Sequence, residues 1–80
     1  MKACIKITLK HGVLDPQGKA IEAALASLGF KGVNEVRQGK YIEVDLAETD
    51  EARSREQVDR ICKDLLANTV IEKYAYELVR

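Results

Sequence analysis

His11 is the only histidine of the chain, and it is the only side chain whose ordinary pKa suits acid–base chemistry near neutral pH. Catalysis would need a nucleophile or a second acid–base group beside it. Asp15 is close in sequence, but an aspartate directly before Pro16 is better explained as the N-cap of a helix that begins at the proline. The residues therefore predict no catalytic site, and we interpret His11 as a residue that orders a loop or contacts a partner.

A phosphate site is the second kind of chemistry that this stretch could support. Gly12 and Gly18 lie on either side of a predicted helix N-terminus, where backbone N–H groups attract anions. Their spacing matches neither of the Gly-rich phosphate fingerprints, and Asp15 would place a negative charge where the anion should bind. We therefore expect this chain to hold no cofactor of its own.

The two cysteines, Cys4 and Cys62, are too far apart in the sequence for a CxxC redox or metal pair. Both lie in or beside the apolar pattern of an expected element, and a reducing cytosol would keep them as thiols. We interpret them as packing residues, so the sequence predicts no metal site.

The composition excludes several classes of partner. Lysines and arginines number 13 and so do aspartates and glutamates, so the formal net charge is zero. This balance gives no general attraction to nucleic acid or to an anionic membrane. The apolar runs are too short to span a bilayer and the first residues lack a signal peptide's apolar segment, so we expect a cytoplasmic protein. The 80 residues predict one domain, 1–80, with a core small enough to depend on oligomerisation.

Hydrophobic periodicity predicts the elements that position these residues. Residues 2–10 alternate strictly, which predicts a half-buried strand with a lysine-rich outer face. Helical spacing predicts a helix over residues 16–28, with Gly29 as its left-handed cap. Residues 33–38 and 41–46 predict two strands that form a hairpin around a tight turn.

The second half of the chain predicts one more helix and one more strand. The helix begins after Thr49 or Asp50, either of which can cap it, and Asn68 is a suitable C-cap. Residues 70–79 alternate again and predict a strand. The apolar stripe expected on the helix comprises Val58, Ile61, Cys62, Leu65 and Leu66.

The element order is βαββαβ, which predicts an α+β ferredoxin-like plait. In this fold a four-stranded antiparallel sheet carries both helices on one face. The last strand has apolar residues on both faces, so we expect a second subunit to cover its outer side. The homodimer candidates are Tyr74, Tyr76, Leu78 and Val79.

The plait alone does not choose a function. A metal chaperone of this fold would place a CxxC motif in the first loop, and an acylphosphatase-like enzyme would place an arginine there. Residues 11–18 contain neither. An RNA-binding plait would carry aromatic residues on its central strands, and only Tyr41 qualifies, so we expect no nucleic-acid partner.

Two connections carry features that a solvated loop does not need. Val13 and Leu14 are apolar, so they either staple the start of the helix or contact another protein. Arg37 and Lys40 flank the expected turn and form a basic tip, which is either solvated or a docking point. The partner-contact candidates are His11, Gly12, Val13, Leu14, Asp15, Arg37, Gln38, Gly39 and Lys40.

Four motifs resemble the PurS family, and they occur in that family's order and spacing along the whole chain. They are Leu9-Lys10-His11-Gly12-Val13-Leu14-Asp15-Pro16-Gln17-Gly18, Leu28-Gly29-Phe30, Val36-Arg37-Gln38-Gly39-Lys40, and Leu65-Leu66-Ala67-Asn68 followed by Val70-Ile71-Glu72. The first motif is specific enough to carry the resemblance nearly alone. The chain departs from the family pattern at Thr69, where PurS proteins usually have proline.

The resemblance implies a non-catalytic subunit of phosphoribosylformylglycinamidine (FGAM) synthase, a ligase of purine biosynthesis. That enzyme converts formylglycinamide ribonucleotide (FGAR) to its amidine with ATP and glutamine, so the complex is expected to use ATP and magnesium. The implied partners are a second copy of the chain, the PurL synthetase subunit and the PurQ glutaminase subunit. The chain would bridge PurL and PurQ and support ammonia transfer, with contacts from the Val13-Leu14 loop and from residues 37–40.

A regulatory module of the ACT type is the alternative from another class of protein. Such modules share the plait and bind small molecules at a dimer interface, and they usually carry a glycine in the loop where this chain has Gly12. Stabilisation of the isolated protein by amino acids or nucleotides would favour this sensor. A stand-alone enzyme would require turnover without partners, which we do not expect.

Overall fold

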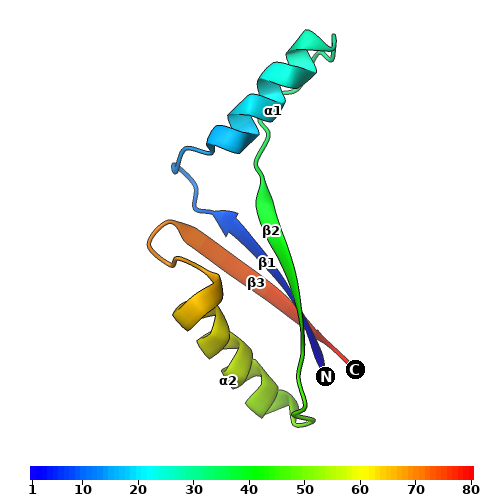
Figure 1. The fold of residues 1–80 in the computed structure, drawn as a ribbon, viewed down its shortest axis with the longest axis vertical. Helices are drawn as coiled ribbons and strands as arrows, with labels where there is room; N and C mark the ends of the chain where they lie inside the picture. The colour runs from blue at the N-terminus through cyan, green and yellow to red at the C-terminus, as the bar shows by residue number, and fades with distance from the viewer.

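A thin three-stranded sheet forms the middle of the molecule, with one helix on its face and another projecting beyond its end (Figure 1). The computed structural model describes residues 1–80 and measures 49 × 26 × 15 Å. The elements are β1 (Lys2–Leu9), α1 (Pro16–Ser27), β2 (Gly39–Asp45), α2 (Glu51–Ile61) with a π-helical last turn (Cys62–Leu66), and β3 (Glu72–Val79).

Strand β1 is the centre of the sheet and pairs antiparallel with β2 on one side and β3 on the other. Its alternation places Ala3, Ile5 and Ile7 on one face, where all three are buried. Helix α2 covers this face and contributes Val58 and Cys62 to the same core. The strict alternation predicted for the first strand is therefore confirmed, and its apolar side is the core.

The predicted four-stranded sheet is wrong, because residues 33–38 form no strand. These residues run along the outside of the molecule as an irregular connection from α1 to β2, with their side chains mostly exposed. The backbone N–H of Gln38 donates to the carboxylate of Asp15 rather than to a neighbouring strand. Since a side chain of another element takes this donor, the hairpin expected around Gln38-Gly39 does not form.

The expectation that both helices cover one face of the sheet is also wrong. Only α2 lies on the sheet, while α1 points away from the end of β1 (Figure 1). Gly18 is the one buried residue of α1. The chain keeps the strand and helix order of a plait minus its second strand, but α1 is not folded back onto the sheet.

The local signals at the ends of α1 are confirmed. Asp15 is the N-cap, Pro16 is the first helical residue, and the C-cap Leu28 is followed by Gly29 at φ +89°. A left-handed φ is the conformation for which glycine is suited at a helix end.

Helix α2 begins where its capping signal predicted, but its C-terminal end differs. Asp50 is the N-cap and accepts a hydrogen bond from the N–H of Ala52 at 3.3 Å. The last turn is π-helical and closes with a 2.9 Å bond from the N–H of Ala67 to the carbonyl of Cys62. A π turn is wider than an α turn, so it rotates the following side chains. Leu65, in this turn, is 80% exposed and does not join the predicted stripe.

Candidate partner-binding site

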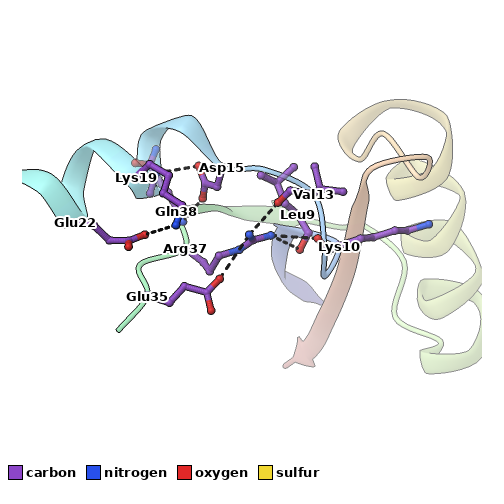
Figure 2. Close-up of polar contacts among 10 residues, drawn as sticks. Leu9, Lys10, Val13, Asp15, Lys19, Glu22, Glu35, Arg37 and Gln38 are labelled. Atoms are coloured by element: carbon purple, nitrogen blue, oxygen red, sulfur yellow. Dashed lines mark hydrogen bonds and ion pairs between the residues drawn. The ribbon is translucent and has the colours of Figure 1, made fainter. Parts of the chain in front are cut away.

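The two stretches predicted as partner contacts meet at the end of the sheet from which α1 projects. Arg37 Nη1 donates a 2.9 Å hydrogen bond to the carbonyl of Val13, which lies 24 residues away in the chain. Its Nη2 donates to the carbonyls of Lys10 at 3.1 Å and Leu9 at 3.5 Å (Figure 2). We call the region formed by residues 9–18 and 36–40 the junction. It brings together nine candidates that the sequence had placed in two separate loops.

Asp15 is the second residue that joins the two stretches. Its Oδ1 accepts the N–H of Gly18 at 2.9 Å, which caps α1, and its Oδ2 accepts the N–H of Gln38 at 2.7 Å. The side chain is buried, with 6% of its surface exposed. The hydrogen bonds from the backbone N–H groups of Gln38 and Gly18, aided by nearby Arg37, lower the pKa of the Asp15 carboxyl from its usual value.

A close approach between two backbones completes the junction. A Cβ atom at Gly18 would collide with the carbonyl oxygen of Val36, and one at Gly39 would lie 2.6 Å from that of Ile7. Only glycine allows these contacts. Sequence reasoning missed this role of Gly18; the available signal was a residue of low helix propensity in the first turn of a helix.

The junction presents an apolar side chain to solvent. Leu14 is 67% exposed and therefore does not staple α1. Val13 is half-buried, and His11 and Gly12 are exposed beside it. Lys40 reaches Glu72 at 3.7 Å, which connects the junction to the start of β3.

The residues from Arg37 to Lys40 do not form the predicted hairpin tip. Arg37 and Gln38 are the end of the irregular connection, and Gly39 and Lys40 begin β2. The guanidinium of Arg37 is occupied by carbonyl oxygens and by Glu35 at 3.7 Å, so it holds the junction together from within.

Three of the four homodimer candidates are half-buried against the core of their own chain. The hydroxyls of Tyr74 and Tyr76 both donate to the carboxylate of Asp59 on α2 at 3.3 Å, and Leu78 is half-buried on the same face. Val79 is 45% exposed on the opposite face.

The larger free apolar surface lies on and just after α1, where sequence reasoning expected contact with the sheet. Ile21 on the helix and Leu28, Phe30 and Val33 after it are all exposed. Leu28 and Phe30 have the highest exposed fractions of the four, 74% and 60%. The apolar residues of this segment therefore do not pack against the sheet of their own chain.

Several titratable side chains outside the junction have pKa values shifted away from neutral pH. Burial raises the pKa of the Cys62 thiol, and contact with Cys4 together with burial raises the pKa of Tyr41 to about 12. No three His, Cys, Asp or Glu side chains gather closely enough to hold a metal ion. None of the helices has the length and apolar character needed to cross a membrane.

A comparison with protein families identifies the family of this chain. The model of the family described as PurS, phosphoribosylformylglycinamidine (FGAM) synthase, matches residues 2–80. The chain belongs to the PurS family. A PurS subunit from Synechocystis is 51% identical over 92% of this chain and 74% of its own length. The Bacillus subtilis PurS subunit is 44% identical over 96% of this chain and 90% of its own length.

Solved PurS structures share the arrangement described above. The structure of Bacillus subtilis PurS matches with a TM-score of 0.88 at 43% identity, covering 99% of this chain and 98% of that one. A chain in the structure of PurLQS from Thermotoga maritima matches with a TM-score of 0.87 at 30% identity, covering 98% and 95%. Because these superpositions include nearly every residue, the projecting α1 is part of the fold that this PurS chain shares with them.

The pKa of Asp15 predicts how the stability of this PurS chain depends on pH. A carboxyl whose pKa is lowered by folding stabilises the native state fully above its unfolded pKa of about 3.9, and this contribution is lost as the pH falls through the folded value. We expect the urea concentration at which half of the protein is unfolded to decrease as the pH is lowered below about 4. Asp15→Asn should flatten this decline in part, since the pKa of Glu48 is lowered as well. An unchanged pH profile in the variant would contradict the assignment.

Proposed function

We propose that this chain is the non-catalytic PurS subunit of FGAM synthase in the cytoplasm, acting as one domain over residues 1–80. In this role it bridges a PurL synthetase and a PurQ glutaminase while the complex converts FGAR, ATP and glutamine to FGAM. The match of residues 2–80 to the PurS family carries the proposal. The similarity to a chain of a PurLQS structure supports the choice of partners. ATP and magnesium would be held by the larger subunits.

The junction is the surface that we propose for contact with the larger subunits. Exposed Leu14 sits on a loop whose backbone is held by Arg37 and Asp15, so it is presented in a defined position. A rigid apolar side chain within a polar rim is suited to act as an interface anchor. His11 and Lys40 would supply that rim.

A second copy of the chain is the partner that we propose for α1. The apolar side of α1 is exposed, while Ile42 and Val44 on the helix-bearing face of the sheet remain half-buried because α2 does not cover β2. Each copy therefore has an exposed apolar helix and an uncovered strand β2. In a dimer, α1 of each copy would pack on β2 of the other. Val79 and the free edge of β3 are the second candidate surface for assembly.

The proposal is tested by FGAM formation with purified PurL and PurQ subunits, with and without this chain. Glutamine and ammonium chloride are supplied in parallel as nitrogen sources. We expect glutamine-driven activity to require this chain and ammonia-driven activity to be independent of it. If neither depends on the chain, the bridging function is wrong, and stabilisation by amino acids or nucleotides should be examined instead.

Leu14→Asp is expected to raise the concentration of this chain needed for half-maximal glutamine-driven activity by about tenfold, because an interface anchor is lost. Leu65→Asp is the matched control, since Leu65 is equally a solvent-exposed leucine but lies on the π-helical turn after α2, away from the junction. Equal effects of the two substitutions would contradict the assignment of the junction as the contact surface.

A further inference from the structure

We infer that Asp15 and Arg37 are positioning residues that set the direction in which α1 leaves the sheet. They hold α1 at a fixed angle to the sheet, so that its apolar side is already in the position in which a second copy of this chain binds it. The inference rests on the proposed dimer and assigns the residues that prepare its surface.

Helix α1 has little packing of its own to hold it in place. Its one buried residue is Gly18 in the first turn, and Ile21, Leu28 and Phe30 farther along are exposed. The helix is joined to the sheet only by residues 10–15 and 28–38, neither of which contains a strand. A helix attached by two irregular connections would swing unless the connections were fixed to each other and to the sheet.

Arg37 fixes the returning connection to the outgoing one. Its guanidinium donates to the carbonyls of Val13 at 2.9 Å and Lys10 at 3.1 Å, and it lies 3.5 Å from that of Leu9. The planar guanidinium can donate in several directions at once, whereas a lysine ammonium is a single compact charge. The three carbonyls span the end of β1 and the loop that leads to α1, so one side chain sets their relative positions.

Asp15 fixes the first turn of α1 to the start of β2. One carboxylate oxygen caps the helix at Gly18, and the other accepts the N–H of Gln38, one residue before β2 begins. Capping requires only one acceptor. The second bond is therefore a tie between elements, and the close approach of Gly18 to Val36 lies directly beside it.

The junction is in turn fixed to the sheet. The N–H of Lys10 donates to the carbonyl of Ile71 at 2.8 Å, and Lys40 pairs with Glu72 across the end of the sheet. Both connections of α1 are thus bonded at the same end of the sheet. Figure 2 shows Arg37 beside Leu9, Lys10 and Val13, and Asp15 near Gln38.

A fixed helix binds a second copy more tightly than a swinging one. Association costs conformational freedom for every group that must be ordered, and a preformed surface reduces that cost. Loss of either tie should weaken the dimer even though neither side chain belongs to the apolar surface of α1. The sheet and α2 share a separate core, so their structure should be retained.

The test compares Asp15→Asn, Arg37→Gln and Arg37→Lys with the wild type. Asparagine keeps an oxygen that can cap α1, but its amide nitrogen cannot accept the N–H of Gln38, so this substitution removes only the tie. The dimer dissociation constant is measured by sedimentation over a range of concentrations. Residual dipolar couplings of backbone amides report the direction of α1 relative to the strands.

We expect Asp15→Asn and Arg37→Gln to raise the dimer dissociation constant by about tenfold. The constant of Arg37→Lys should lie between those of the wild type and Arg37→Gln. The couplings of α1 should shrink or change while those of the strands are retained. Arg53→Gln is the matched control, because Arg53 is an exposed arginine of α2 whose ion pair is with Asp50 at 3.7 Å.

Two results would overturn the role of Asp15 and Arg37 as positioning residues. One is an unchanged dissociation constant and unchanged α1 couplings in both Asp15→Asn and Arg37→Gln. The other is a general loss of strand signals in both variants, which would mean that the two residues support the whole fold. A wild type that stays monomeric would overturn the link to the dimer, and this failure is separate from that of the bridging function, which is measured by glutamine-driven FGAM formation.

Discussion

Replacing Ile5 with alanine is expected to lower the free energy of unfolding by roughly 2–5 kcal/mol. Ile5 is completely buried at the centre of β1, directly opposite Ile42 on β2 and Tyr76 on β3. Removing most of its side chain loses buried apolar contacts and leaves a cavity that the three strands cannot close. Because the free energy of unfolding of a domain is only about 5–15 kcal/mol, this single change should remove a large part of it.

Chemical unfolding followed by circular dichroism measures this effect. Ile5→Val should cost only about 0.5–1.5 kcal/mol, because most of the side chain remains. Val70→Ala is the surface control, since Val70 is 79% exposed and its truncation should stay within about 0.5 kcal/mol. The assigned core would be wrong if Ile5→Ala cost no more than Val70→Ala.

Replacing Gly18 with alanine is expected to destabilise the junction, although glycine to alanine normally stabilises a helix by about 0.5–1 kcal/mol. The new Cβ would collide with the carbonyl oxygen of Val36, which is backbone and cannot rotate away. Residues 36–38 must therefore move, which strains the bond from Gln38 to Asp15. We expect a loss of about 1–3 kcal/mol, as for overpacking in a core, together with weaker glutamine-driven activity.

Unfolding of Gly18→Ala and its activity in the reconstituted complex test this prediction together. Gly12→Ala is the control, because Gly12 has φ +90° but, apart from its chain neighbours, no atom lies within 4 Å of the position that a Cβ would take. Its cost should come from the backbone alone, about 1–2 kcal/mol, without displacing residues 36–38. A stabilised Gly18→Ala protein would show that the two backbones are not held this close together.

Much of the local structure was predictable because its causes lie within a few residues of each other. Asp15 before Pro16 marks the start of α1, and Gly29 marks its end. Asp50 marks the start of α2, and alternation located β1 and its buried face. The motif around residues 9–18 also led to the family that the comparison of residues 2–80 identifies.

The candidate site was predicted as two sets of residues but not as one place. Nothing in the sequence around Val13 or Arg37 indicates that the Arg37 side chain donates to the carbonyl of Val13. Hydrogen bonds between a side chain and distant backbone atoms depend on where both segments lie in space, so no periodicity reports them. The low helix propensity of glycine at position 18 was the one local sign that two backbones meet there.

The sequence by itself determined where both helices begin, the strand pattern of β1 and the family. Tertiary structure alone decided that residues 33–38 form no strand and that α1 projects beyond the sheet. The physical reason is that an apolar stripe indicates which side of a helix is buried but does not determine which surface covers it. In this chain the capping carboxylate of Asp15 also accepts the N–H of Gln38, which ties the first turn of α1 to the segment that precedes β2.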